Sequence, residues 1–555
     1  MADRDERRHG LEFLREQVLD VSPHPSTADA QAYVTRARLG AALILIIVLG
    51  LTLRLYHVRS PILDHPGWRQ GDESAIARNF ATLQNNIFYP QTDYDGPPPN
   101  YVELELQIVP YLAAQLYRIF GVHEIFLRLI VIAFSLATIP LLFALGAELY
   151  SRRAGLIAAL LFAITPGAVY YGRAILPESD MIFFGFGALL FWWRWCARRR
   201  AGDFALATLF AALAWLAKPP ALLLLAPMLA VSVARSRARV FSDWSPYVLL
   251  AASLLPLAAY LHHVSAIAEW HWASGITLKH VLPTLRLELA RPAALLVGLQ
   301  ATLALAKMLS TTILGPVLFG LTLLASFTQP PLFSSTVNAD GTAREAEHGR
   351  FRACFFGAWF AALCLYAFVV VNVERVDYYL MPFVPFAALY ASGALDHLLS
   401  LLAPRTSRSF GGYAAMAAAL FLTCYAGMLA VHPYYTWSRP VYSAATELRS
   451  RLAPGSLIVM GHYDPSVLYT IGRRGWEEDP LLWNVHDMTS AINKGARYFV
   501  ALEVPRFRAN KQLYAFMQRY RRVPVRSGWQ VYDFRHFAHK EPANAATGAN
   551  ASAPR

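Results

Sequence analysis

Long apolar runs recur along the chain and alternate with short polar stretches. Most of them are about 17 to 25 residues long, the length at which a helix crosses the hydrocarbon core of a bilayer. The candidate spans are 39–57, 125–149, 154–171, 180–197, 203–217, 220–234, 246–262, 309–328, 353–372, 379–401 and 411–431. The pattern predicts an all-α polytopic membrane protein with about eleven transmembrane helices.

The pattern changes after residue 431. Short apolar segments typical of strands occur at Ser456–Gly461, Arg497–Leu502 and Trp529–Phe534, and segments 441–452 and 508–520 have the period of amphipathic helices. We therefore expect a small α/β domain over residues 432–537. The Ala/Asn/Pro-rich end, 538–555, is expected to be disordered.

Composition supports the membrane interpretation. Of the 555 residues, 56% are hydrophobic and only 16% are charged, against roughly 25% charged in ordinary soluble proteins. With only four cysteines (Cys196, Cys354, Cys364 and Cys424), a disulfide scaffold is excluded. All four fall in or at the ends of predicted spans, and no spacing indicates a zinc site. The net charge of +13 comes from basic clusters between apolar runs, so no nucleic-acid partner is expected.

Arginine placement predicts the orientation. Arginines precede the first span and then gather at every second connection: Arg4, Arg7, Arg8, Arg15, Arg36, Arg38; Arg152, Arg153; Arg194, Arg198, Arg199, Arg200; Arg235, Arg237, Arg239; Arg405, Arg408. By the positive-inside rule, residues 1–38 lie in the cytoplasm, and an odd number of spans puts the tail outside. The long segments 58–124 and 263–308 are then outer loops, and 329–352 is an inner flexible linker. Chemistry is expected on the outer face.

The first candidate site group is Asp72 and Glu73, which follow Gly71 in the first outer loop. Ionisable groups at a membrane edge are costly and usually face a partner or a cavity. Because Ser74–Leu83 has the pattern of a short helix, Asp72 or Ser74 as its N-cap is one interpretation. The other is a general base held above the membrane surface.

The second group is Arg173, Glu178 and Asp180, between the third and fourth predicted spans. A polar turn followed by a helix that starts at a proline would explain it structurally. An arginine and two carboxylates within eight residues, at the start of a span, favour a functional site instead. Glu178 and Asp180 are two positions apart and would point to different sides of a helix, so only one needs to face that site.

Glu103 and Glu105 form the third group. Both are interpreted as the solvated first turn of a helix over Tyr101–Phe120, and for Glu103 the alternative is a group that binds sugar or acceptor. Cationic and phenolic groups on the same face could bind phosphate: Lys218, Lys279, His280, Arg375, Tyr378 and Tyr379. For each of them, snorkelling or placement in the interfacial aromatic belt is the structural alternative.

These motifs together resemble the membrane glycosyltransferases of the C type (GT-C), in the branch of the protein O-mannosyltransferases and the lipid A aminoarabinose transferases (glycosyltransferase families 39 and 83). The matching segments are GDE at 71–73, RAILPESDM at 173–181, LAKPPALLL at 216–224, DYYLMPFVPFAALYASG at 377–393 and GRRGW at 472–476. The likeness covers residues 39–535. Pro177-Glu178-Ser179 stands where the family often has Leu-Leu, which leaves Glu178 and Asp180 both open; the spacing to Met181 favours Asp180.

The resemblance implies transfer of a sugar from a polyprenyl-phosphate donor to an acceptor hydroxyl on a protein, lipid or glycan, with inversion, in a bacterial inner membrane. Asp72 would be the base, and Glu73 or Asp180 would orient a substrate. Glu103 and Glu178 would contact sugar or acceptor. Arg173, Lys218, Lys279, His280, Arg375, Tyr378 and Tyr379 would neutralise the phosphate. No cofactor is certain, and a divalent metal is possible. The alternative is a transporter or flippase of lipid-linked sugars, which would show internal repeats; none is evident.

Overall fold

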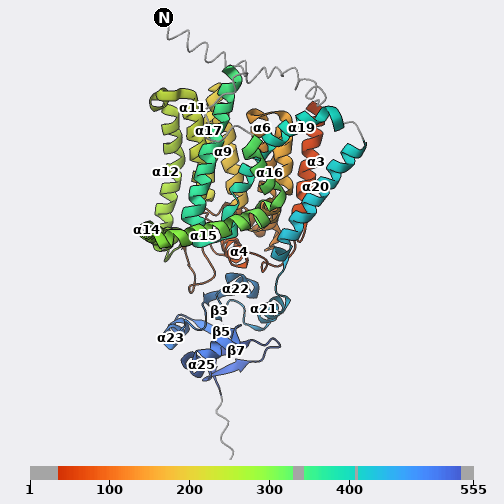
Figure 1. Ribbon diagram of the computed structural model, residues 1–555. Helices are drawn as coiled ribbons and strands as arrows, with labels where there is room; N and C mark the ends of the chain where they lie inside the picture. The colour runs from red at the N-terminus through yellow and green to blue at the C-terminus, as the bar shows by residue number, and fades with distance from the viewer. Residues whose placement is uncertain (1–35, 329–342, 407–409, 539–555) are drawn as a thin grey trace, which may run out of the picture.

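A helical bundle carries a small α/β domain at one end (Figure 1). The computed structural model describes residues 36–328, 343–406 and 410–538. Most of the predicted cytoplasmic segment, part of the predicted linker and the predicted disordered end lie outside these residues. Within the described residues the two parts meet at helix α4 (Gly67–Thr82) of the first outer loop, directly above α22 (Pro465–Ile471) of the C-terminal domain.

The bundle is built from long apolar helices joined by short turns and distorted segments. Its helices are α3 (Arg36–Leu55), α6 (Ile125–Leu149), α7 (Arg152–Ile164), α8 (Pro166–Tyr171), α9 (Glu178–Arg198), α10 (Ala201–Ala217), η1 (Pro219–Leu224), α11 (Leu225–Ser236), η2 (Arg237–Ser242), α12 (Trp244–Ile267), α16 (Gly315–Thr328), α17 (Ala343–Tyr366), η5 (Ala367–Val371), α18 (Asn372–Glu374), η6 (Asp377–Leu380), α19 (Phe383–Thr406), α20 (Phe410–Val431) and η7 (His432–Tyr435).

The long helices show that this is an integral membrane protein. In the described residues, six helices are long and apolar enough to cross a bilayer, and the bent pair Gly298–Ile313 and Gly315–Phe327, at 116°, would be a seventh. Shorter apolar helices cover the predicted runs 203–217 and 220–234. The predicted run 154–171 is broken at Thr165, because Pro166 starts a new helix there. Residues 343–352, predicted as linker, belong to α17.

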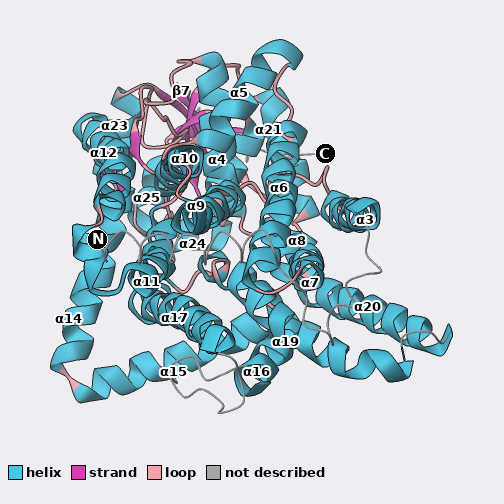
Figure 2. Cartoon of the chain, turned by 90° about the horizontal axis from the view of Figure 1, so that it is seen from above, coloured by secondary structure: helices cyan, strands magenta, loops and turns pink. Residues whose placement is uncertain are grey.

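The segment after α12, predicted as an outer loop, also folds into helices. It contains β2 (Trp270–His271), α13 (Trp272–Gly275), η3 (Ile276–Val281), α14 (Leu282–Ala290), α15 (Pro292–Met308) and η4 (Leu309–Ile313). Helices α14 and α15 lie across the end of the bundle that faces the C-terminal domain and follow its periphery (Figures 1 and 2). The segment therefore encloses the same end as α4.

The first outer loop differs from its predicted helices. Helix α4 starts at Gly67, seven residues before the predicted Ser74. The second helix, α5 (Ile108–Phe120), starts at Ile108 and not at Tyr101. Before it, β1 (Val102–Glu103) pairs in parallel with β2, and Glu103 lies opposite His271. The pairing fixes the first outer loop against the second.

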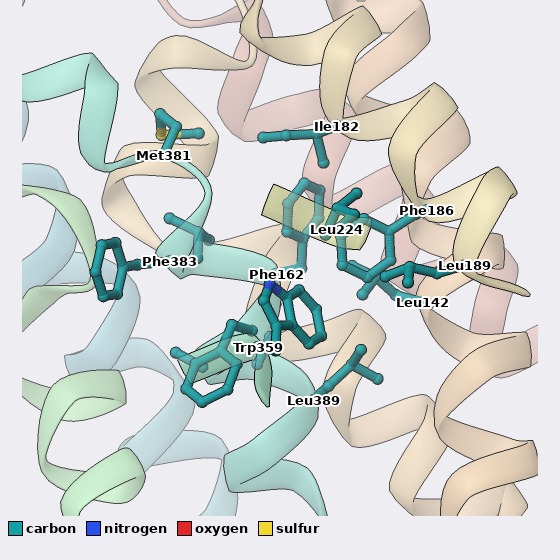
Figure 3. Packing of buried hydrophobic residues seen from close by; sticks show 14 of the residues in the cluster. Leu142, Phe162, Ile182, Phe186, Leu189, Leu224, Trp359, Met381, Phe383 and Leu389 are labelled. Atoms are coloured by element: carbon teal, nitrogen blue, oxygen red, sulfur yellow. The ribbon is translucent and has the colours of Figure 1, made fainter. Parts of the chain in front are cut away.

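One large apolar cluster fills the bundle. It joins side chains of α6, α7, α9, α17 and α19, including Leu142, Phe162, Phe186, Trp359 and Leu389 (Figure 3). The rings of Phe186 and Trp359 have centroids 5.6 Å apart. Dense packing of this kind holds α9 and α19 in fixed positions; α9 begins with Glu178 and Asp180, and η6, just before α19, carries Tyr378 and Tyr379.

The C-terminal domain is a five-stranded sheet with helices on both faces. Its strands are β3 (Leu457–Gly461), β4 (Arg474–Glu477), β5 (Ala496–Ala501), β6 (Tyr520–Val523) and β7 (Gln530–Phe537), in the order β4-β3-β5-β7-β6; β3 is parallel to β4 and β5, and β7 is antiparallel to its neighbours. Helices α21 (Arg439–Arg451) and α22 cover one face, and α23 (Val485–Asn493), α24 (Val504–Ala509) and α25 (Lys511–Met517) cover the other. The three predicted strands are present, and the predicted helix 508–520 is divided between α24 and α25.

Candidate active site

Helix α4 carries Asp72 and Glu73 inside the protein. The helix begins after Pro66, so Asp72 lies in its second turn and neither Asp72 nor Ser74 caps it. The N-cap interpretation is therefore wrong. Asp72 and Glu73 are 3% and 2% exposed, because α5 and α22 pack against α4. Burying two charged carboxylates is costly unless hydrogen bonds or ion pairs compensate for the lost hydration, so we expect such partners or a functional role.

One carboxylate oxygen of Asp72 accepts a hydrogen bond, and the other has no hydrogen-bond partner. The indole Nε1 of Trp68 donates to Asp72 Oδ2 at 2.9 Å, while Oδ1 is buried without a hydrogen-bond partner. Burial raises the pKa of Asp72 to about 7, although Arg69 and the hydrogen bonds from Tyr94 and Trp68 oppose the shift. Asp72 is thus a carboxyl group poised to take up a proton near neutral pH.

Arg69 joins Glu73 to Glu105. Its guanidinium is 2.9 Å from Glu73 and forms a closer ion pair with Glu105. Burial raises the pKa of Glu73; Arg69 opposes this, and the charges of Glu105, Asp72 and Glu178 add to it. Glu105 is buried and lies before α5, so its interpretation as part of a solvated helical turn is wrong. Asp72, Glu73, Glu105 and Glu178 therefore lie close to one another, and we call this group the acidic region.

Lys218 reaches the same region from the end of α10. Pro219 and Pro220 cannot continue that helix, and the residue before a proline is forced into an extended conformation; Lys218 has φ −165° and ψ 124°. Its ammonium pairs with Glu178 and lies 5.0 and 4.7 Å from the ring centroids of Tyr378 and Tyr379. Three of the predicted phosphate-binding residues are therefore brought together beside Glu178.

Both carboxylates at the start of α9 are buried. Glu178 and Asp180 are each 1% exposed, and Glu178 Oε2 and Asp180 Oδ1 lack hydrogen-bond partners. The charges of Glu73 and Glu178 both act on Asp180. The whole first turn of α9 is enclosed, so burial does not separate the two, and which of them faces the site stays a prediction. Of the two, Glu178 has the direct cationic partner.

Arg173 occupies a separate buried network. Its guanidinium is 2.6 Å from Asp64 Oδ2, and Arg128 is 3.0 Å from Asp64 Oδ1; all three side chains are at most 1% exposed. Burial would raise the pKa of Asp64, but the two guanidinium groups outweigh it and hold the pKa below its usual value. Arg173 also lies under the ring of Tyr435, at 4.5 Å. The network ties the first outer loop to the bundle.

The remaining predicted residues lie apart from these contacts. Glu103 accepts hydrogen bonds from Ser265 and Ser274, which use both of its oxygens. Lys279 and His280 are exposed, and His280 Nδ1 is 2.9 Å from Glu374. Arg375 is exposed and donates to the carbonyl oxygen of Asn372. Their roles in binding sugar or phosphate stay predictions.

The C-terminal domain closes against α4. Arg78 and Arg474 both approach the buried Asp93, and Arg474 also donates to Asn79. The amide of Gly96 donates to the carbonyl oxygen of Gly475, and that of Gly475 donates to Asp93. The GRRGW segment therefore forms β4 and the contact with the first outer loop.

Sequence reasoning missed Trp68, Arg69 and Asp64. The first two had a usable signal, since Trp68 precedes Asp72, and Arg69 precedes Glu73, by four residues, the spacing that brings side chains together on a helix. Asp64 had none, because its partners Arg128 and Arg173 are distant in the sequence.

Throughout 36–328, 343–406 and 410–538, no group of three or more His, Cys, Asp or Glu side chains is arranged to hold a metal ion. The acidic region contains two cations: Arg69 pairs with Glu73 and Glu105, and Lys218 pairs with Glu178.

Comparison with known proteins gives the fold. Residues 107–263 match the family described as dolichyl-phosphate-mannose-protein mannosyltransferase. The structure of ArnT from Cupriavidus metallidurans bound to undecaprenyl phosphate is similar over 88% of this chain and 97% of that one, with a TM-score of 0.55 and 14% identity. The chain has the GT-C glycosyltransferase fold.

A second similar structure is larger. The archaeal oligosaccharyltransferase AglB from Archaeoglobus fulgidus, in complex with an inhibitory peptide and a dolichol-phosphate, matches 91% of this chain and 75% of its own, with a TM-score of 0.51 and 14% identity. The search of curated proteins finds no match. The GT-C resemblance seen in the short motifs is confirmed at the level of the fold.

Proposed function

We propose that the protein is a membrane glycosyltransferase that moves a sugar from a polyprenyl-phosphate donor to an acceptor hydroxyl. The observation that carries this proposal is Asp72, a buried carboxyl group with a pKa of about 7 and one unbonded oxygen. A base with these properties can take a proton from a hydroxyl group at neutral pH. Binding a lipid-linked sugar without chemistry would not require it.

In the proposed reaction, Asp72 Oδ1 accepts the proton of the acceptor hydroxyl. The acceptor oxygen forms a bond to the anomeric carbon as the bond from that carbon to the phosphate oxygen breaks. The electron pair of that bond leaves with the polyprenyl phosphate, and direct displacement inverts the anomeric centre. Trp68 holds the other oxygen of Asp72 and so fixes the direction in which the carboxylate faces.

Lys218, with Tyr378 and Tyr379, is proposed to bind the phosphate. A cation in a buried setting stabilises developing negative charge more strongly than one in water. Glu178 neutralises Lys218 in the structure, and the donor phosphate would share or replace this partner. Arg69 supplies a second cation one turn from Asp72, and Glu73 and Asp180 are left to orient the sugar or the acceptor.

Two similarities support this donor class. ArnT and AglB were each solved with a polyprenyl phosphate, undecaprenyl phosphate in one and dolichol-phosphate in the other. Both lipids carry the phosphate group that would leave in the proposed reaction. AglB was also solved with an inhibitory peptide, and the acceptor proposed here is a hydroxyl group on a protein, a lipid or a glycan.

The proposed location is the outer face of a bacterial inner membrane. The acidic region and the C-terminal domain lie at the same end of the bundle (Figure 1), and the predicted Arg-rich connections lie at the other. The positive-inside rule then places the N-terminus in the cytoplasm, the catalytic part over 39–431, and the domain over 432–537 outside. Cleavage of a protease site inserted after Gly528 in intact spheroplasts would support this orientation.

Transfer is tested with purified, reconstituted protein and labelled polyprenyl-phosphate sugars, using cell-envelope extracts as the source of acceptors. We expect labelled acceptor and free polyprenyl phosphate in equal amounts. Asp72→Asn should reduce the rate by about 10² to 10⁴ while the protein still folds and inserts. The control is Asp479→Asn, which removes a carboxylate on the surface of the C-terminal domain. Movement of the labelled lipid across the bilayer without transfer would contradict the proposal.

A further inference from the structure

A carboxylate without hydrogen-bond partners on either oxygen lies where the C-terminal domain meets the first predicted outer loop. Glu477 ends β4 and is 6% exposed. Neither of its oxygens has a hydrogen-bond partner, and the same is true of Asp72 Oδ1. A buried carboxylate in this state is costly to keep charged unless a proton or a cation neutralises it.

The groups around Glu477 increase that requirement. The charged side chains that act on it most strongly are Asp72, Asp464, Asp95 and Glu478, in that order, and all of them are acidic. Burial and these negative charges raise the pKa of Glu477 well above its usual value. Burial, Glu269 and Glu478 likewise raise that of Asp95 to about 7. Arg69 and Lys218 are already engaged with Glu73, Glu105 and Glu178.

Contacts between the two parts of the protein assemble this group, which we call the acidic junction (Asp72, Asp95, Asp464 and Glu477). Asp464 caps α22, and its Oδ2 lies 3.4 Å from the position of a Cβ added at Gly67 of α4. Asp95 precedes Gly96, and the amide of Gly96 donates to the carbonyl oxygen of Gly475, which lies two residues before Glu477. The junction therefore exists only while the C-terminal domain is docked.

Aromatic rings accompany the carboxylates. Trp68, which donates to Asp72, has its ring 4.4 Å from that of Tyr463 and 6.0 Å from that of Trp272, and Tyr463 is 44% exposed. Trp476, the residue before Glu477, packs on Gly96. An ammonium or guanidinium group can form ion pairs with carboxylates and cation–π contacts with neighbouring aromatic faces. Within the described chain, these carboxylates are not arranged to hold a metal ion.

We propose that the acidic junction binds an organic cation carried by the acceptor. The proposal rests on the function proposed above and adds the substrate class: an acceptor with an ammonium or guanidinium group near its reactive hydroxyl. Asp72 borders both regions. The cations for the phosphate lie on its Glu73 side, and the junction lies on the side of the C-terminal domain. An acceptor held by Glu477 and Asp464 would present its hydroxyl to Asp72 from the side of the C-terminal domain.

The test measures equilibrium binding to the full-length protein in detergent and needs no transfer. One pair of probes is a Ser-Lys peptide, N-acetylated and C-amidated, with its Ser-Gln counterpart; the other is glucosamine with glucose. We expect the cation of one pair to bind at least about tenfold more tightly than its neutral counterpart, and the pair that shows it identifies a peptide or a glycan acceptor. If the protein prefers the cationic probe but shows no transfer activity, the proposed function is contradicted and the proposed cation site is not.

Glu477→Gln should abolish the preference for the cation and leave binding of polyprenyl phosphate unchanged. The matched control is Glu503→Gln, which removes an exposed carboxylate of the same domain that pairs with His462; it should keep the preference. Equal binding of charged and neutral probes to the wild-type protein would overturn the proposal, whether or not the variant folds. A preference that appears only with added Mn²⁺ would also overturn it, in favour of a metal site.

Discussion

Gly71 of α4 packs directly on Ser466 of the C-terminal domain. A Cβ added at Gly71 would lie 2.5 Å from the backbone nitrogen of Ser466 and 2.7 Å from its Cα, closer than non-bonded atoms approach each other. The next residue after Gly71 is Asp72. The glycine thus allows a folded domain to lie against the turn of helix that carries the proposed base.

Gly71→Ala should displace the C-terminal domain from α4. Overpacking against backbone atoms costs about 1 to 3 kcal/mol, and a shift of about 1 Å at a catalytic group can reduce the rate by about 10². We expect a loss of transfer activity of that order and faster proteolysis between the domains. Gly202→Ala is the control, since nothing lies within 4 Å of a Cβ there; equal behaviour of the two variants would contradict the packing argument.

The pH profile of transfer should report Asp72. With a pKa raised from 3.8 to about 7, the carboxyl group is protonated below that pH and cannot act as a base. We therefore expect kcat/KM to fall about tenfold for each pH unit below 7 and to level off above it. A flat profile between about pH 5 and 9 would mean a base with an ordinary carboxyl pKa.

Trp68→Phe provides a directional check on that profile. The indole hydrogen bond lowers the pKa of Asp72, so its removal should raise the pKa further and move the profile to higher pH. A shift to lower pH, or none, would show that another group controls the rate.

Two lysines that looked equivalent in the sequence should behave differently. Lys218 is buried against Glu178, Tyr378 and Tyr379, whereas Lys279 is exposed. Lys218→Met should raise the apparent KM for the polyprenyl-phosphate donor by at least about tenfold, measured at saturating acceptor. Lys279→Met should leave it within about twofold; the reverse result would move the phosphate site to the second outer segment.

Asp64 should be important for stability. Asp64→Asn leaves Arg128 and Arg173 buried without their carboxylate, which costs about 3 to 5 kcal/mol. We expect a clear drop in the thermal unfolding temperature in detergent. Asp396→Asn removes the partner of Arg153, which is one-third exposed, and should cost at most about 1 kcal/mol. Similar losses in both variants would argue against a special role for the buried network.

The local patterns in the sequence predicted the helices and strands better than they predicted which of these elements contact each other. Hydropathy located α6, α9, α12 and α19, and short apolar segments located β3, β5 and β7. The pattern could not show that α4 is buried on nearly every side, because the groups that cover it come from α5 and from the C-terminal domain. For the same reason, Asp72 could be interpreted as a helix cap.

The sequence identified several residues that the structure brings together, while their roles stay predictions. Asp72, Glu73, Glu178, Asp180, Lys218, Tyr378 and Tyr379 do gather at one end of the bundle, because three turns in the chain end at the same membrane edge. Arg173 belongs to the network of Asp64, a partnership that depends on how α6 and the first outer loop cross. Nothing in the spacing of RAILPESDM distinguishes an arginine that faces Asp64 from one that faces Asp180.

Docking of the C-terminal domain on α4 also determines when the site is completed during synthesis. Asn79 of α4 and Arg474, which bonds to it, are 395 residues apart in the chain. The nascent protein must therefore insert its whole bundle with one face of α4 uncovered. Asp72 is buried only after nearly all of the chain has been made, so an incomplete chain in the membrane would carry the proposed base in water, with the ordinary acidity of an exposed aspartate.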